Sequence, residues 1–153
     1  MEHLFTITRQ NRKILFNYLK NTPGDMLNKI PKGFNNNIWW NIAHVVVTQQ
    51  KLVYGLSGVP LNVSKELVGK YEKGTFPIGV PSEAEVSDIK KMVFDLPEQT
   101  VQDYKNSFFT TFKPYMTTPK IPLNSVEDAI AFNVFHEGLH LGSIMALARA
   151  VKV

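Results

Sequence analysis

Hydrophobic residues recur at spacings of three and four along four stretches of the chain, and this period is typical of helices that bury one face. The stretches predict helices over residues 2–20, 36–56, 82–112 and 125–151. The second stretch is apolar on nearly every side, which indicates a helix with neighbours all around it. Its run Val45-Val46-Val47 favours a strand when taken alone, but the length of the apolar stretch favours a helix.

Local signals mark the beginnings and breaks of these helices. Ser82 followed by Glu85, and Ser125 followed by Asp128, each place a hydroxyl at the N-cap with an acidic residue three positions later. Pro97 falls inside the third stretch and predicts a kink or a restart of that helix. Shorter helical pieces are expected over residues 23–29 and 64–70, and the three prolines in residues 113–124 predict an extended segment.

The order of these elements predicts an all-α fold, a four-helix bundle, in a single domain that spans residues 1–153. A long segment rich in glycine and proline, residues 55–81, joins the second helix to the third. A connection of this length indicates a crossover rather than a simple up-down-up-down path. Loops this long in compact domains are often functional.

The composition narrows the classes of protein to which the bundle can belong. The hydrophobic fraction of 44% and the charged fraction of 20% are typical of globular proteins. The chain has no cysteine, so histidines and carboxylates are its only strong metal ligands. Its net charge of +4 comes from scattered lysines without an arginine-rich tract, so we expect no nucleic-acid partner. No apolar stretch approaches membrane-spanning length, so we expect no membrane association and a cytoplasmic location.

The last predicted helix carries two of the four histidines, His136 and His140. Positions i and i+4 lie about 40° apart around a helix and about 6 Å apart along it, so both side chains can reach one ion. Both fall within the apolar arc of the helix, where an unpaired polar group costs about 1–3 kcal/mol. A core histidine bonded to a carbonyl or hydroxyl is the commoner arrangement, but a pair on one buried face favours a shared metal ion.

The same segment matches the HExxH pattern, in which zinc proteases use the two histidines as ligands and the glutamate, here Glu137, as general base. Those proteases take a third ligand downstream, whereas the thirteen residues after His140 include no His, Asp or Glu. The third ligand must therefore lie upstream, at His44 or His3, and His3 sits at the frayed start of the chain. Three imidazoles leave a coordination position open, as catalytic metal sites do.

Two motifs together resemble the DinB-like superfamily over nearly the whole chain. They are Trp40-Asn41-Ile42-Ala43-His44 and the HxxxHxGxI pattern within residues 133–144. The resemblance implies a four-helix bundle with one divalent metal ion (Zn, Ni, Fe or Mn) bound by three histidines, which match His44, His136 and His140. Glu137 falls where members vary and is a weak candidate for a catalytic residue. A hydrogen bond to a ligand imidazole and a helix-surface or capping role are equally open for it.

The resemblance also implies an enzyme that acts on a small molecule, by thiol-dependent S-transfer or by metal-dependent hydrolysis. The absence of cysteine fits a low-molecular-weight thiol cosubstrate whose thiolate the metal stabilises, without requiring one. The alternatives are a non-catalytic bundle that binds a small ligand or a partner helix, and a nucleic-acid-associated protein built on the +4 charge. A homodimer is also expected, from the resemblance and from spare apolar surface on the second helix and at residues 108–112.

Overall fold

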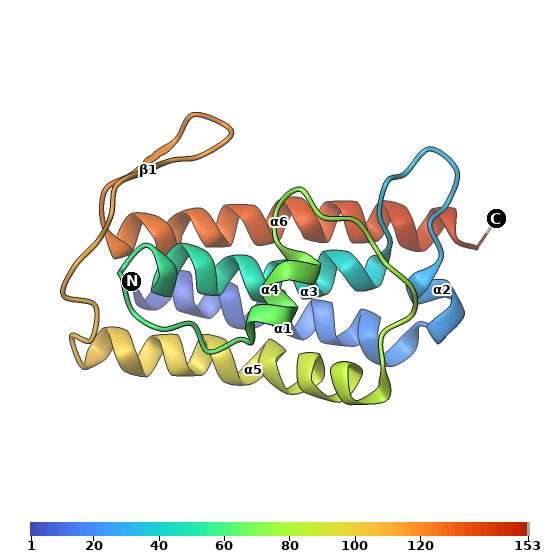
Figure 1. Ribbon diagram of the computed structural model, residues 1–153, viewed down its shortest axis with the longest axis horizontal. Helices are drawn as coiled ribbons and strands as arrows, with labels where there is room; N and C mark the ends of the chain where they lie inside the picture. Colours follow the sequence, from blue (N-terminus) through green and yellow to red (C-terminus); the bar gives the residue numbers. More distant parts are fainter. Residues whose placement is uncertain (153) are drawn as a thin grey trace.

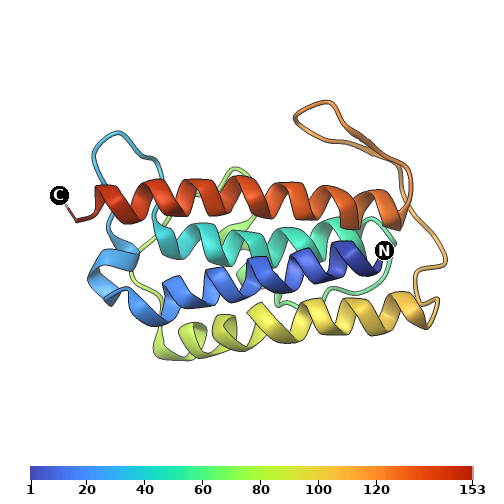
Figure 2. The same cartoon turned by 180° about the vertical axis from the view of Figure 1, so that it is seen from behind.

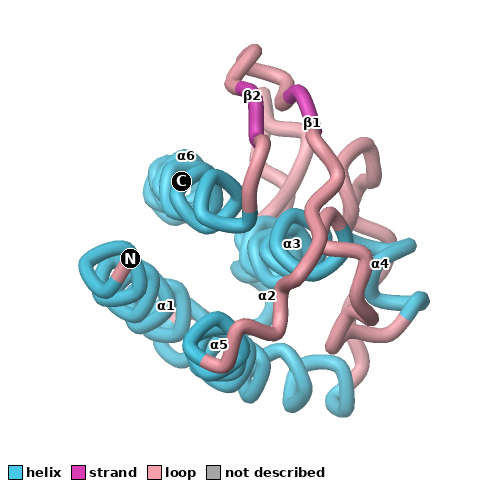
Figure 3. Tube along the Cα trace, turned by 90° about the vertical axis from the view of Figure 1, so that its left-hand side faces the viewer, coloured by secondary structure: helices cyan, strands magenta, loops and turns pink. Residues whose placement is uncertain are grey.

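The computed structural model describes residues 1–152, and in them four long helices lie side by side (Figure 1). These helices are α1 (Glu2–Asn21), α3 (Ile38–Gln50), α5 (Glu83–Lys105) and α6 (Val126–Ala150). Viewed along the bundle, α6 packs beside α3, and α1 packs against both α5 and α6 (Figure 3). The all-α four-helix bundle expected from the apolar periodicity is confirmed.

α1 and α6 run in one direction and α3 and α5 run in the other, as Figure 1 and the reverse view in Figure 2 show. Because α3 and α5 are parallel, the chain has to return along the bundle between them. The returning segment carries the short helix α4 (Lys65–Tyr71) on the outside of α3 (Figure 3). The hydroxyl of Ser64 caps α4 by accepting a hydrogen bond from the backbone N–H of Leu67. The predicted crossover connection is therefore present.

The interior consists of two apolar clusters with buried polar side chains between them. One cluster includes Leu15, Ile42, Val93 and Ile144, and the other includes Phe5, Val53, Val101 and Ile130. α1, α5 and α6 each contribute residues to both apolar clusters and to the polar residues between them. α3 contributes to the first cluster and to the polar residues, and the residues that follow it, Leu52, Val53 and Tyr54, contribute to the second cluster. The polar residues, which we call the polar layer, are Thr8 and Arg12 on α1, Gln49 and Gln50 on α3, Thr100 on α5, and Asn133 and Glu137 on α6.

α3 is buried at every residue except Thr48, as its all-round apolar pattern predicts. It continues into η1 (Lys51–Gly55), a turn of π-helix, so the second predicted helix has the expected extent but widens in its last turn. The serine caps at Ser82 and Ser125 are confirmed, because their hydroxyls accept from the backbone N–H groups of Glu85 and Asp128. The short helix α2 (Gly24–Asn28) forms near the first predicted break.

α5 is shorter than predicted, because it ends at Lys105 rather than near Phe112. Ser107 has a φ of 55°, a left-handed conformation that cannot continue a right-handed helix. The next aromatic residues then fold back onto the second apolar cluster, where the ring centroid of Phe109 lies 5.1 Å from that of Tyr54. Pro97 does not end the helix, which continues through it.

The predicted extended segment before α6 contains a small antiparallel hairpin of β1 (Tyr115–Met116) and β2 (Pro122–Leu123). The hydroxyl of Thr117 closes it by donating to the carbonyl of Ile121 and accepting from the N–H of the same residue. The hairpin stands on the side of the bundle where α3 and α6 meet (Figure 3). Among residues 1–152, none of the helices combines the length and the apolar character needed to cross a membrane.

Candidate metal centre

Three imidazoles meet between α3 and α6. α3 contributes His44, and α6 contributes His136 and His140 one turn apart. One possible ligand nitrogen of each ring lies within 4.8 Å of those of the other two. The ring centroids are 4.5 Å apart for the α6 pair, and they lie 4.7 Å (His140) and 5.2 Å (His136) from that of His44. Within the described part of the chain, this is the group spaced to share a metal ion, and His3 is not part of it.

Hydrogen bonds fix the tautomers of two of these rings. Nδ1 of His44 lies 2.6 Å from the carbonyl oxygen of Tyr71, which can only accept, so this nitrogen donates and the lone pair is on Nε2. Nδ1 of His140 lies 2.8 Å from Oδ1 of Asn41. The Asn41 amide is itself oriented, because its Nδ2 donates to the carbonyl of Asn37. His140 therefore also donates from Nδ1 and presents the lone pair of Nε2.

The surroundings keep the three imidazoles uncharged. Burial lowers the pKa of His136 to about 3, and the proximity of the His44 ring and of the Arg12 guanidinium acts in the same direction. Burial lowers the pKa of His140 to about 3, again with help from the neighbouring imidazoles. Burial also lowers the pKa of His44 against the opposing effect of its bond to Tyr71. Neutral imidazole is the form that binds a metal, so all three side chains are ready ligands at neutral pH.

The end of α4 and the segment that follows it hold His44 in place. The indole N–H of Trp39 donates to the hydroxyl of Tyr71, which donates in turn to the carboxylate of Glu85 on α5. The ring of Trp40 stacks on that of His44 with centroids 4.6 Å apart, and its indole N–H donates to the hydroxyl of Thr75. The two tryptophans therefore anchor the crossover segment, and its backbone orients the imidazole.

Glu137 lies at the centre of the buried face of α6, so the helix-surface and capping roles considered for it are wrong. Its carboxylate is 0% exposed and accepts from Nε of Arg12 at 3.0 Å and from Nη2 of Arg12 at 2.8 Å. Nδ2 of Asn133 donates to the same oxygen at 2.9 Å. Glu137 does not line the cavity beside the histidines and contacts α1 instead. It therefore joins α6 to α1 directly behind the metal ligands.

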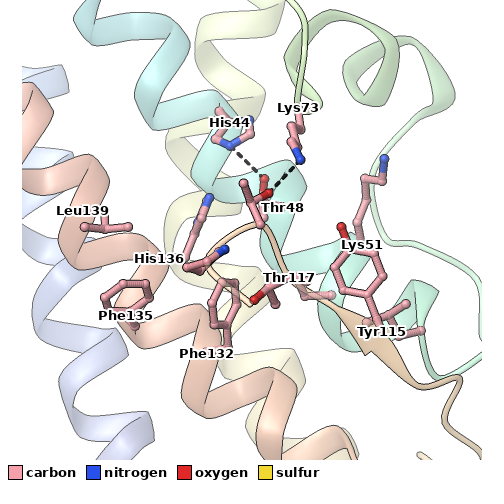
Figure 4. Close-up of a pocket in the computed structure, with 14 residues that line it drawn as sticks. His44, Thr48, Lys51, Lys73, Tyr115, Thr117, Phe132, Phe135, His136 and Leu139 are labelled. Atoms are coloured by element: carbon pink, nitrogen blue, oxygen red, sulfur yellow. Dashed lines mark hydrogen bonds between the residues drawn. The ribbon is translucent and has the colours of Figure 1, made fainter. Parts of the chain in front are cut away.

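A cavity of about 660 Å³ opens beside the three rings. His44 and His136 form part of its wall, next to the hydroxyl of Thr48, which lies 3.2 Å from Nε2 of His44 (Figure 4). The rest of the lining comes from η1, the crossover, the hairpin and the start of α6, as Leu52, Leu56, Lys51, Lys73, Tyr115, Thr117, Thr118, Pro119, Phe132, Phe135 and Leu139. This volume is within the usual range for sites that bind small molecules.

These three side chains fit a metal ion. Two of them present Nε2 lone pairs because their Nδ1 atoms donate elsewhere, which is the arrangement in which a second hydrogen bond orients a metal-bound histidine. Nδ1 of His136 is buried without a hydrogen-bond partner in residues 1–152. Three nitrogen donors at the edge of a cavity leave room for a further ligand from the cavity side.

Residues outside the HExxH segment complete the centre, and reading the sequence did not identify them. Arg12 occupies the middle of a buried stripe on α1 that also contains Phe5, Thr8, Leu15 and Leu19. That stripe has the spacing of a core face, so an arginine within it was a signal for a buried acidic partner. Asn41 and Tyr71 carried no comparable signal, because their roles depend on how distant segments pack.

Comparison with known proteins agrees with the fold and with the histidine cluster. The sequence matches the profile of the DinB superfamily over residues 7–144, a span that includes His44, His136 and His140. No curated protein matches the chain.

Replacing Arg12 with methionine should destabilise the protein strongly. The change leaves the Glu137 carboxylate buried with the Asn133 amide as its remaining donor, and breaking a buried ion pair in this way costs about 3–5 kcal/mol. Urea unfolding of the metal-free protein measures the loss. The double variant Arg12→Met, Glu137→Met should recover at least half of it, because no unpaired charge remains.

The matched control is Arg9→Met, which removes the exposed ion pair between Arg9 and Glu98 on the same helix. Its effect should stay within about 1 kcal/mol. Equal losses for Arg9→Met and Arg12→Met would contradict the importance assigned to the buried pair.

The metal-free protein should lose stability as the pH falls from about 6.5 towards 3. The pKa values of His136 and His140 lie near 3 in the folded chain and near the ordinary 6.5 in the unfolded chain, so the unfolded state binds more protons in this window. Each histidine then removes up to about 1.4 kcal/mol per pH unit. Urea unfolding between pH 7 and pH 5 should show this slope, and His136→Asn, His140→Asn should flatten it. An unchanged slope in the double variant would show that these rings are not its source.

Proposed function

Since the chain belongs to the DinB superfamily, we propose that it is a metal-dependent enzyme in which His44, His136 and His140 bind one divalent metal ion. The observation that carries the proposal is the convergence of three uncharged imidazoles from two helices beside a cavity, of whose wall His44 and His136 form part. A structural metal site is normally closed by four protein ligands, whereas this one offers three. The remaining position faces a space large enough for a small substrate.

A bound metal ion in this position acts as a Lewis acid that lowers the pKa of a water or thiol and polarises a substrate. The side chains of the chain supply orientation. Tyr71 and Asn41 fix two imidazoles from behind, and the hydroxyl of Thr48 lies beside Nε2 of His44, where it can contact a ligand entering the open position. Phe132 and Phe135 give the α6 side of the cavity an apolar surface next to this point.

Zn, Ni, Fe and Mn are all compatible with three imidazole ligands, because such sites discriminate weakly among first-row divalent ions. We propose two reaction types for the centre, S-transfer with a low-molecular-weight thiol and hydrolysis. The first is supported by the absence of cysteine, since the nucleophilic sulfur then has to come from a cosubstrate. Both need a small molecule in the same cavity.

Protein purified without nickel-affinity resin should contain close to one equivalent of a divalent metal, which His136→Ala, His140→Ala should abolish. The matched control is His3→Ala, which removes the histidine outside the cluster and should keep the metal. Elemental analysis by mass spectrometry measures both. A wild-type chain that binds none of the four metals would leave a non-catalytic bundle as the better description.

Cobalt(II) then tests the open position in the same preparation. Adding a small thiol to the cobalt-loaded chain should produce a sulfur-to-metal charge-transfer band if thiolate enters the coordination sphere. A spectrum that thiol leaves unchanged would favour hydrolysis over S-transfer.

We also propose a homodimer, formed through the outer face of α6. Of the apolar surface expected from the sequence, that of α3 is buried within the bundle and Phe109 and Phe112 pack on the second apolar cluster, whereas Phe108 remains 47% exposed. Next to the residues that line the cavity, the outer face of α6 exposes a row of uncharged residues, Ala131, Gly138, Gly142, Met145 and Ala146. A second copy of the same face, with small residues opposite large ones, is the simplest cover for it.

Light scattering coupled to size-exclusion chromatography should give twice the chain mass for the wild type and the monomer mass for Met145→Glu. Lys91→Glu, on the exposed side of α5, is the control and should remain dimeric. A monomeric wild type would remove this part of the proposal.

A further inference from the structure

The cavity beside the three histidines is lined by two lysines and, among the described residues, by no acidic side chain. The two lysines are Lys51 and Lys73. A divalent ion on three neutral imidazoles adds further positive charge at the same wall. A ligand that fills this cavity is therefore favoured if it brings the negative charge itself.

The two lysines differ in how their charges are used. Lys51 forms an ion pair with the carboxylate of Glu72, so its charge is already matched. Lys73 forms no ion pair within residues 1–152, and its Nζ donates one hydrogen bond of 2.7 Å to the hydroxyl of Thr118 in the hairpin. An ammonium group has three donors, so Lys73 keeps capacity for a ligand.

The fold holds Lys73 at the cavity by bonds to the residues around it. The carbonyl of Tyr71 accepts from His44, the carboxylate of Glu72 binds Lys51, and the hydroxyl of Thr75 accepts from the indole of Trp40. Lys73 lies within this anchored run and bridges to the hairpin. The same segment that orients a candidate metal ligand therefore also positions the unpaired ammonium.

The wall contributed by α6 is apolar. Phe135 and Leu139 lie on one side of the cavity and Lys51 and Lys73 on the other, as Figure 4 shows. Phe135 is 46% exposed and Leu139 55% exposed, so both present apolar surface to the cavity. The cavity thus has an apolar side and a cationic side, with the histidines between the two.

We propose that the substrate is an amphipathic carboxylate, whose carboxylate group binds Nζ of Lys73 and the hydroxyl of Thr118 and whose apolar body lies against Phe135 and Leu139. This proposal rests on the function proposed above, because it names the substrate class of the same site. Lys73 is a binding residue in this account, and the reacting part of the substrate lies towards the histidines. Amines of the same shape are excluded by charge.

Three probes with one apolar body test the proposal on the metal-loaded full chain: 4-phenylbutyrate, 4-phenylbutan-1-ol and 4-phenylbutylamine. Ligand-observed NMR titration should show the acid binding about tenfold or more tightly than the alcohol, and the amine more weakly than either. Lys73→Met should lower the affinity for the acid by about tenfold and leave that for the alcohol unchanged. Lys73→Arg should retain the preference, and Lys91→Met, a distant exposed lysine, is the matched control.

Repeating the titration on metal-free protein separates this proposal from the metal site. A preference for the acid that survives metal removal and disappears in Lys73→Met supports the lysine subsite, even in a chain that binds no metal. If the preference for the acid disappears when the metal is removed but is unchanged in Lys73→Met, the carboxylate binds the metal. That result overturns the lysine subsite and leaves the proposed metal centre intact. Equal binding of acid and alcohol by the wild type also overturns it.

Discussion

Three imidazoles that are largely removed from water have to remain uncharged, and their ring nitrogens still need hydrogen-bond or metal partners. The residues around them are arranged to meet this requirement. Tyr71 and Asn41 each accept from one Nδ1, which leaves the Nε2 atoms of His44 and His140 with lone pairs that face a common point. Nε2 of His44 lies beside the hydroxyl of Thr48, whereas Nδ1 of His136 is buried without a partner in residues 1–152, and a buried polar group that loses water and gains nothing costs free energy. A shared metal ion satisfies all three rings at once. The crossover segment and both tryptophans are needed to keep one of these rings in place.

The buried side chains of the polar layer also need polar partners inside the bundle. The layer separates two apolar clusters, and it places the ion pair of Arg12 and Glu137 directly behind the ligands on α6. Glu137 follows His136 in sequence but forms its ion pair with Arg12 on α1. The two histidines of the HExxH segment therefore face His44 on α3, whereas its glutamate faces α1. A buried ion pair contributes little net stability and much specificity of packing in some proteins. In this bundle it fixes α6 against α1, which fixes the direction in which the two histidines point.

The fold could be predicted largely from local patterns, and the centre only in part. Apolar periodicity, the two serine caps and the length of the crossover are properties of neighbouring residues, and they lead to the bundle and its connection. His136 and His140 are linked by helical spacing, whereas His44 joins them through a resemblance and through the lack of a ligand downstream. Arg12 was missed because a charged residue on a helix is normally exposed, and its partner lies 125 residues away in sequence. The end of α5 at Lys105 coincides with the left-handed conformation of Ser107 and with the packing of Phe109 against Tyr54, and helical period reveals neither.

The most direct test of the central claim is a crystal structure with anomalous diffraction recorded at the absorption edges of zinc, nickel, iron and manganese. Our account predicts one anomalous peak bonded to the side-chain nitrogens of His44, His136 and His140, with a non-protein ligand completing the coordination from the cavity. A peak elsewhere in the chain, with the three rings retaining the positions and hydrogen bonds described above and no metal between them, would contradict it.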